Sequence, residues 1–214
     1  MIEVKNISKK IKGNQVLCNI SCNFENGKVY GIYGRNGSGK TMLMRCILGL
    51  VFVDEGYIKM DNYLIGKDMD FPKSVGAIIE NPTFFPYATG FENLKMLADI
   101  RKIISDDRIR EVMNKVGLDD KDKRTVSKYS LGMKQRLAIA QAIMEEPQLL
   151  VLDEPTNALD EQGVQMFRDI IMEEKRKGTI ILLASHNKED IELLADVKIQ
   201  MIDGKIDSVI DKDN

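Results

Sequence analysis

The stretch "GRNGSGKT", residues 34–41, decides the fold of this chain. Its spacing is G-x-x-x-x-G-K-[ST], and glycines at such positions let the backbone curve so that several N–H groups point into one cup. The lysine of this pattern reaches the β- and γ-phosphates of a nucleotide, and the final hydroxyl binds Mg²⁺. The residues predicted to bind the nucleotide are Gly34, Arg35, Asn36, Gly37, Ser38, Gly39, Lys40 and Thr41, with Thr41 also a ligand of Mg²⁺.

The residues on either side of this stretch support the same interpretation. "KVYGIY" (28–33) is an apolar strand pattern, and "KTMLMRCILGL" (40–50) is a helix pattern that ends near Gly49. The start of that helix adds the positive end of its dipole, which favours bound phosphate. A flexible glycine loop is the alternative, but it requires neither the strand, nor the helix, nor the Lys-Thr pair in this register.

Length and composition describe an ordinary soluble domain. At 214 residues the chain is one domain, or one domain with an inserted lobe. Its hydrophobic content of 43% and charged content of 30% are typical of globular proteins. The net charge of −2 gives no attraction to nucleic acid, so we expect no such partner. The apolar runs are too short to cross a bilayer, and no secretion signal is seen, so we expect a cytoplasmic protein.

The cysteines point to a reducing compartment. There are three, Cys18, Cys22 and Cys46, and an odd number in a protein with a phosphate loop suggests free thiols. Cys18 and Cys22 could be imagined as metal ligands. Neither a second cysteine pair nor a nearby histidine accompanies them, which argues against a metal site there.

The pattern along the chain predicts an α/β core interrupted by helices. The first 33 residues read as strands, and strands return in the apolar runs "QLLVLDE" (148–154) and "TIILLASH" (179–186). Strands that are apolar throughout are typical of a parallel sheet with helices on both faces. We therefore expect a single domain over 1–214, with a core lobe at about 1–82 and 147–214 and a helical subdomain at about 83–146.

Two carboxylates end the strand pattern "QLLVLDEP". In a parallel α/β sheet, ligands bind beyond the carboxyl ends of the strands. Asp153 can hold Mg²⁺ opposite a phosphate loop, and Glu154 can polarise the water that attacks the phosphate. Acidic pairs at strand ends also cap turns, and this is the structural alternative.

The segment "YSLGMKQRLAIAQAI" (129–143) predicts a helix with an anion-binding start. Ser130 is a natural N-cap, and Ser130 and Gly132 lie where free N–H groups can bind an anion. Alone this signal is weak, since many helices begin with serine. The helix is expected to bury a stripe made of Met133, Leu137, Ala140 and Met144.

The order of these motifs resembles the ATP-binding cassette family, the nucleotide-binding subunits of ABC transporters, over essentially the whole chain. This resemblance implies ATP as the nucleotide, with residues 34–41 as the Walker A loop and Ser130–Gly132 in the signature motif. Asp153 is then the Walker B aspartate, Glu154 the catalytic glutamate, Asp160 a D-loop residue that helps bind ATP, and His186, the single histidine, the catalytic switch residue. The expected fold is a P-loop NTPase with an N-terminal antiparallel β subdomain and an inserted α-helical subdomain.

Three positions depart from the common pattern of the family. The signature reads Ser130-Leu131-Gly132-Met133 rather than S-G-G-Q, and Glu80 replaces the usual glutamine that contacts Mg²⁺. Ile11 occupies the place of the aromatic residue that stacks on adenine, so Tyr33 or Phe24 could stack instead. The stretches "IIENPTFFPYATGFENL" and "YSLGMKQRL" resemble the exporters linked to bacitracin resistance and lantibiotic immunity.

The resemblance implies an ATPase subunit that powers a permease on a separate chain, at the inner face of the cell membrane, for export of antimicrobial peptides. Two ATPs would close a homodimer, or a heterodimer with a second cassette, each site taking Ser130 and Gly132 from the partner. One alternative is a soluble ABC ATPase without a transport role, of the iron–sulfur assembly type. Another is a phosphate-loop kinase, which transfers phosphate to a small acceptor instead of releasing it.

Overall fold

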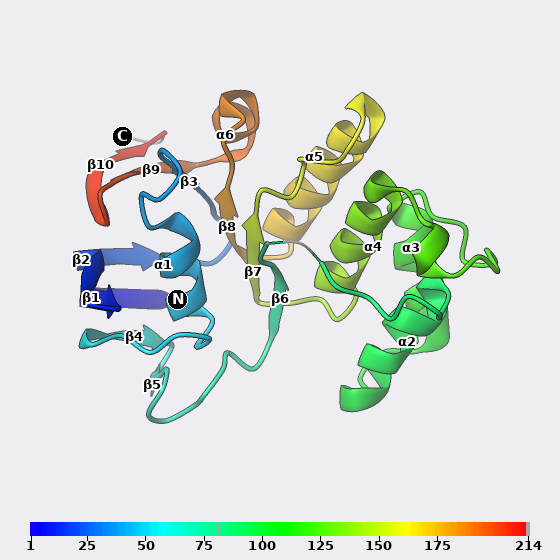
Figure 1. The fold of residues 1–214 in the computed structure, drawn as a ribbon, viewed down its shortest axis with the longest axis horizontal. Helices are drawn as coiled ribbons and strands as arrows, with labels where there is room; N and C mark the ends of the chain where they lie inside the picture. The colour runs from blue at the N-terminus through cyan, green and yellow to red at the C-terminus, as the bar shows by residue number, and fades with distance from the viewer. Residues whose placement is uncertain (81, 213–214) are drawn as a thin grey trace.

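The computed structural model describes residues 1–80 and 82–212, and within these residues the chain forms two β-sheets with helices around them (Figure 1). The four-stranded sheet is antiparallel, in the order β2-β1-β4-β5. Its strands are β1 (Ile2–Ile11), β2 (Asn14–Phe24), β4 (Glu55–Met60) and β5 (Tyr63–Leu64). This sheet is the N-terminal antiparallel subdomain that the resemblance predicts.

The six-stranded sheet, in the order β10-β9-β3-β8-β7-β6, carries the phosphate loop. Its strands are β3 (Val29–Tyr33), β6 (Val75–Ile78), β7 (Leu149–Asp153), β8 (Ile180–Ala184), β9 (Val197–Ile202) and β10 (Lys205–Asp211). All neighbouring pairs are parallel except β9 and β10, which form a hairpin. Every residue of β7 and β8 is buried, as expected for strands covered on both faces.

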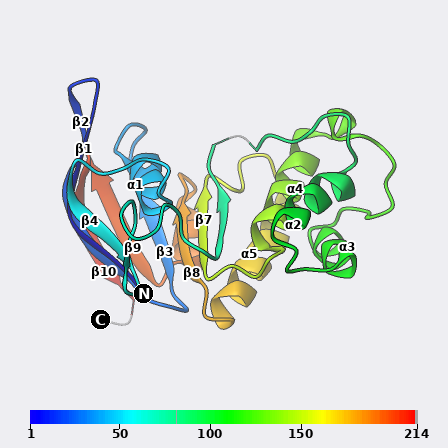
Figure 2. The ribbon, with the colours of Figure 1, turned by 90° about the horizontal axis from the view of Figure 1, so that it is seen from below.

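Two apolar clusters cover the two faces of the six-stranded sheet. One lies between the two sheets and includes helix α1 (Lys40–Ile47). The other joins the opposite face to α5 (Glu161–Arg176) and α6 (Lys188–Leu194), and continues into the helices at the far end of the molecule (Figure 2). These end helices are α2 (Gly90–Arg101), α3 (Asp106–Lys115) and α4 (Leu131–Ile143), with the short 3₁₀ helix η1 (Val126–Lys128). The helical region therefore shares its core with the sheet, and its exact boundaries stay a prediction.

Side-chain caps start the helices that flank the sheet. Ser130 Oγ accepts from the Met133 amide at 3.1 Å, which confirms it as the N-cap of α4. Asp160 caps α5 by accepting from the Gly163 amide at 2.8 Å. Such caps satisfy amide groups that have no partner within the helix, and each contributes about 1 kcal/mol.

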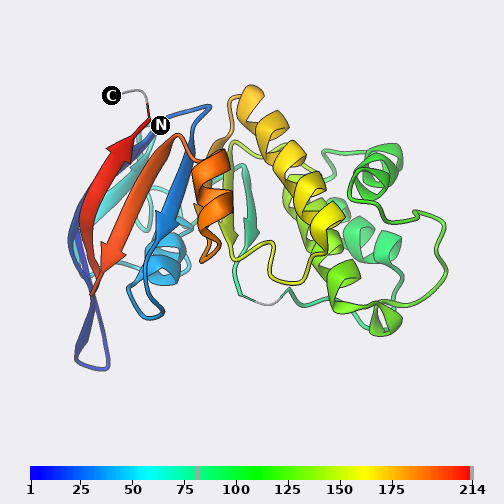
Figure 3. The ribbon, with the colours of Figure 1, turned by 90° about the horizontal axis from the view of Figure 1, so that it is seen from above.

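The β1–β2 hairpin extends beyond the body of the molecule (Figure 3). Its tip is the turn Lys12–Gly13, and the pairing of the two strands shifts register between Lys9 and Lys10. The strand positions next to the tip are exposed, because no other element covers this end of the hairpin. Ile11 lies in this exposed part.

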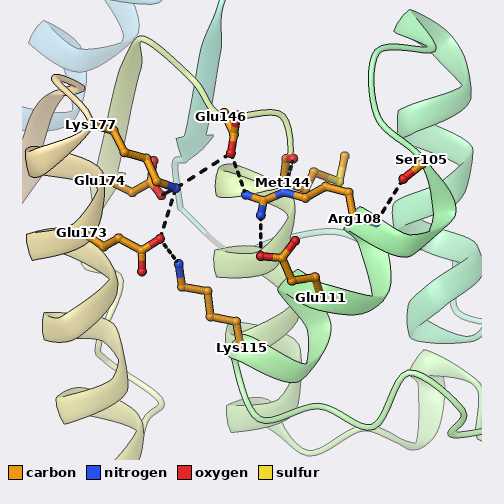
Figure 4. Close-up of polar contacts among 9 residues, drawn as sticks. All are labelled: Ser105, Arg108, Glu111, Lys115, Met144, Glu146, Glu173, Glu174 and Lys177. Atoms are coloured by element: carbon orange, nitrogen blue, oxygen red, sulfur yellow. Dashed lines mark hydrogen bonds and ion pairs between the residues drawn. The ribbon is translucent and has the colours of Figure 1, made fainter.

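A cluster of ion pairs, which we call the α3–α5 ion cluster, joins the helical region to the core (Figure 4). It consists of Arg108, Glu111, Lys115, Glu146, Glu173, Glu174 and Lys177. Lys115 on α3 contacts Glu173 on α5 at 2.6 Å, and Lys177 contacts Glu174 at 2.9 Å. The Glu174 side chain is 1% exposed, so its charge depends on Lys177 for compensation.

Candidate nucleotide-binding site

The phosphate loop connects the end of β3 to the start of α1, and neighbouring backbone determines its shape. A Cβ atom on Gly34, whose φ is +154°, would lie 2.2 Å from the Met201 carbonyl oxygen on β9. The Gly204 amide, in the β9–β10 turn, donates to the Ser38 carbonyl at 3.0 Å. The end of the β9–β10 hairpin thus supports the loop and excludes any side chain at Gly34.

Lys40 folds back across the loop that precedes it. Its ammonium group donates to the carbonyl oxygens of Gly34 at 2.9 Å and Arg35 at 3.3 Å. The Ser38 hydroxyl is buried, and the described residues offer its oxygen no hydrogen-bond partner. A buried donor of this kind is a polar group that a phosphate oxygen could satisfy.

The carboxylates that follow β7 reach the loop and the end of β8. Thr41 Oγ1 donates to Asp153 Oδ2 at 2.5 Å. Glu154 Oε2 lies 2.6 Å from His186 Nδ1 and accepts from the His186 amide at 3.3 Å. Asp153 pairs with Ala184 in the sheet, so the residues after both strands emerge side by side. Glu154 has a left-handed φ of +52°, an uncommon conformation that is often found at functional sites.

Residues 36–41 line a cavity of about 870 Å³, which is large enough for a nucleotide. Glu80, Asp153 and Glu154 line the same cavity, and Arg45 and Lys134 add two cations. A second cavity of about 990 Å³ is lined by residues 34–38, of which 36–38 also line the first cavity, and by His186. The structure therefore brings the phosphate loop together with Glu80, Asp153, Glu154 and His186.

The oxygen atoms of Thr41, Glu80 and Asp153 are the type of ligand that Mg²⁺ prefers. Among the described residues, no group of three or more His, Cys, Asp or Glu residues is arranged to hold a metal ion by itself. Mg²⁺ usually takes one or two carboxylates and completes its shell with phosphate oxygens and water. The residues at this cavity fit a cation that arrives with a nucleotide.

Three predicted site residues, Ser130, Gly132 and Asp160, do not line this cavity. Leu131, whose side chain is 70% exposed, does line it. Asp160 caps α5 and pairs with Arg136 at 3.1 Å. The pKa of Asp160 is lowered, chiefly by the hydrogen bond from the Gly163 amide, so its carboxylate stays charged.

The position of the β1–β2 hairpin changes which residues are candidates for contact with adenine. Val16 on β2 lines the nucleotide cavity, whereas Ile11 does not. Phe24 is fully buried in an edge contact with Tyr30, so the alternative that placed it on adenine is wrong. Tyr33 lines the second cavity instead. Sequence reasoning missed Val16 because only the pairing of β1 with β2 shows which residue turns toward the loop.

The cysteine thiols have no part in this site. All three are free, and burial raises the pKa of the Cys22 thiol to about 12 and that of Cys46 to about 11. Thiols with such pKa values are protonated at neutral pH, so Cys22 and Cys46 are poor nucleophiles.

Comparison with known proteins agrees with this geometry. The family described as "ABC transporter" matches residues 17–157. The chain is 51% identical to the "Uncharacterized ABC transporter ATP-binding protein YybJ" of Bacillus subtilis (strain 168), covering 97% of this chain and 95% of that protein. It is 40% identical to the "Bacitracin transport ATP-binding protein BcrA" of Enterococcus faecalis, over 96% and 68% of the two chains. It is 38% identical to the "Lantibiotic transport ATP-binding protein SrtF" of Streptococcus pyogenes, over 96% and 89%.

Solved structures show the same fold. An "ATP binding subunit of ABC transporter" superposes with a TM-score of 0.91 at 25% identity, covering 100% of this chain and 90% of that chain. A dimeric ATP-binding cassette bound to ADP and Pi superposes with a TM-score of 0.88 at 22% identity, covering 99% and 98%. Within the described residues, no helix is both long and apolar enough to cross a membrane. The match over residues 17–157 and the identity of 51% to YybJ show that this chain belongs to the ABC transporter family, as an ATP-binding subunit with ATPase activity.

Proposed function

We propose that this chain hydrolyses ATP to power a membrane permease carried on a separate polypeptide, and that the transported substrate is an antimicrobial peptide leaving the cell. The chain works at the inner face of the membrane, where cytoplasmic ATP is available. BcrA and SrtF, which share 40% and 38% of their aligned residues with this chain, are named for bacitracin and lantibiotic transport. These names support the class of cargo.

One observation carries the ATPase part of the proposal, namely the convergence of Lys40, Thr41, Asp153 and Glu154 on one cavity. Lys40 neutralises charge on the β- and γ-phosphates, while Thr41, Glu80 and Asp153 hold Mg²⁺. Bound Mg²⁺ supplies positive charge that stabilises the phosphate oxygens during transfer. Glu154 accepts a proton from the water that attacks the γ-phosphorus, the bond from that phosphorus to the bridging oxygen of ADP breaks, and ADP and free phosphate leave.

His186 serves as a positioning group for this base. Its ring nitrogen and its backbone amide both contact Glu154 Oε2, at 2.6 Å and 3.3 Å. Two contacts to one oxygen restrict the carboxylate to few orientations, while the other oxygen stays available for the water. This arrangement fits a base that must meet its substrate at one angle.

The complete site requires a second cassette, which is either another copy of this chain or a related subunit. Ser130 and Gly132 lie at the exposed start of α4 and do not line the cavity of their own chain. The amide groups at this helix start can bind the γ-phosphate held by a partner subunit. Asp160 starts α5 and would help hold ATP through the loop at the contact between the two cassettes.

The test uses the chain together with the membrane protein that copurifies with it. Both are reconstituted into vesicles with the chain outside, and uptake of labelled bacitracin or lantibiotic is measured with MgATP. We expect peptide uptake and phosphate release, both lost with Glu154→Gln. If the chain releases phosphate but no membrane protein copurifies with it, the result would favour a soluble ABC ATPase. Phosphate transfer to a small acceptor would favour a kinase.

A further inference from the structure

Arg45 and Glu80 form an ion pair at the wall of the nucleotide cavity. Arg45 Nη2 lies 2.5 Å from Glu80 Oε1, and both residues line the cavity. Arg45 follows Thr41 by one helical turn on α1, so the two side chains lie on the same face of that helix. Glu80 comes from the segment after β6. The pair therefore joins the phosphate-loop helix to the residue that is proposed to meet the cation.

The pair is placed by the backbone on both sides. Glu80 has a left-handed φ of +59°, which is uncommon for a glutamate and strains its backbone. The Arg45 carbonyl accepts from the Leu50 amide at 2.9 Å, so the last turn of α1 is fixed. Among the described residues, Glu80 is the only partner of the Arg45 side chain by hydrogen bond or ion pair. Within the described residues, the Arg45 guanidinium is therefore engaged by Glu80 alone.

The other carboxylates of the cavity lack such a cation. Asp153 accepts from a neutral hydroxyl, and Glu154 contacts the imidazole of His186. Metal-free ATP is strongly anionic, and like charges in one cavity repel. Arg45 cancels the charge of Glu80 while they are paired. The cavity then presents one carboxylate fewer to an incoming nucleotide.

We propose that Arg45 is an exchangeable counter-ion of Glu80, through which the cavity distinguishes ATP bound to a divalent cation from metal-free ATP. When metal-free ATP binds, Glu80 remains paired with Arg45. When the nucleotide carries a divalent cation, Glu80 binds the cation instead and its ion pair with Arg45 breaks. This inference rests on the proposed function, because it assumes that residues 34–41 bind ATP.

A purely structural ion pair makes a different prediction. If Arg45 only fastens the segment after β6 to α1, removing it should weaken both forms of the nucleotide by the same factor. If Arg45 competes with the cation for Glu80, removing it should weaken metal-free binding and strengthen metal-bound binding. The ratio of the two dissociation constants separates these outcomes, since it cancels any general loss.

The experiment measures binding of the non-hydrolysable analogue AMP-PNP by calorimetry, once in EDTA and once in Mg²⁺. The proteins are the wild type, Arg45→Gln, Glu80→Gln and the double variant. We expect Arg45→Gln to raise the ratio of the EDTA to the Mg²⁺ dissociation constant about 3- to 10-fold, since an exposed pair is worth up to about 5-fold in each condition. In the Glu80→Gln background the same change should move the ratio less than about 2-fold.

Two controls keep the result interpretable. Arg101→Gln breaks another ion pair, with Glu145 at 2.7 Å, and should leave the ratio unchanged. Arg45→Lys keeps the charge, so its ratio of dissociation constants should stay close to that of the wild type. Glu80→Gln alone should lower the ratio. If Arg45→Gln does not fold, these two variants test the proposal instead. An equal loss in both conditions, or the same ratio change in both backgrounds, overturns the counter-ion role. A wild type that binds no AMP-PNP at all would instead contradict the proposed function.

Discussion

The nucleotide cavity and the α3–α5 ion cluster are both rich in charged side chains, but the partners of these side chains differ between the two regions. In the cluster, charges meet opposite charges, as Lys115 meets Glu173 at 2.6 Å. In the cavity, Arg45 and Glu80 also form an ion pair, but Lys40 is held by neutral carbonyls and Asp153 by a hydroxyl. A charge held by neutral groups keeps most of its field for a ligand, whereas paired charges cancel. The charges of Lys40 and Asp153 are therefore available to a ligand, whereas those of the cluster compensate one another within the fold.

The strongest test of this difference compares a glutamate from each region. Glu154→Gln should lower steady-state phosphate release by about 10²- to 10⁴-fold, because loss of a positioned base costs that much. Glu173→Gln, in the ion cluster, should leave the rate within about 2-fold, because in the described part of the chain Glu173 pairs only with lysines of the cluster. A phosphate-release assay on both variants tests this difference. Comparable losses of phosphate-release rate in the two variants would show that the two regions do not differ in function.

The second test reverses the comparison and measures stability. Lys177→Met leaves the buried Glu174 without its cation, so the free energy of unfolding should fall by about 1–3 kcal/mol. Urea denaturation followed by circular dichroism measures this, and ATP affinity should not change. Lys123→Met, at an exposed position, is the matched control. A stable Lys177→Met protein with weakened ATP binding would assign the cluster to the site instead of the fold.

The third test uses pH. The hydrogen bond from Lys115 is the main cause that lowers the pKa of Glu173 below its ordinary value of 4.5. A lowered pKa in the folded state contributes stability above pH 4.5, and this contribution is lost as the pH falls through the folded-state pKa. Glu173→Gln should therefore cost less than about 1 kcal/mol at neutral pH, and less still as the solution is acidified. A difference in unfolding free energy that stays constant with pH would exclude this linkage.

The smallest effect concerns the edge of the cavity. Val16→Ala should weaken ATP about 2- to 3-fold, because Val16 is half-buried and loses part of its apolar contact with the nucleotide. Ile11→Ala should have no measurable effect, since Ile11 lies near the exposed hairpin tip. Calorimetric titration of both variants locates the adenine end, and the reverse order of effects would restore Ile11 as the contact.

The sequence predicted those features that are determined by interactions between residues close together in the chain. The helix that begins at Lys40 after the glycine-rich stretch and the cap at Ser130 each depend on a few neighbouring residues, and the structure contains both features. The contact of Glu154 with His186 depends on β8 lying beside β7, which spacing alone does not determine. The resemblance to a family gave both residues a catalytic role but did not predict their contact.

Contacts without a local signal were not predicted. The Arg45–Glu80 pair joins residues that are 35 positions apart, on elements that meet only in the folded chain. The position of Val16 depends on a register shift between β1 and β2. The shared core of the helical region and the sheet was also invisible, because an amphipathic helix pattern shows which face is buried but not against what.

The support of Gly34 and Ser38 by residues 201–204 has a consequence for synthesis on the ribosome. The phosphate loop emerges early, but the Met201 carbonyl and the Gly204 amide that shape it emerge more than 160 residues later. Contacts this distant in sequence form late in folding. Until the β9–β10 hairpin has been made, the loop lacks the contacts of Met201 and Gly204. The order of translation therefore places Asp153 and Glu154 in the chain before the last contacts of the phosphate loop can form.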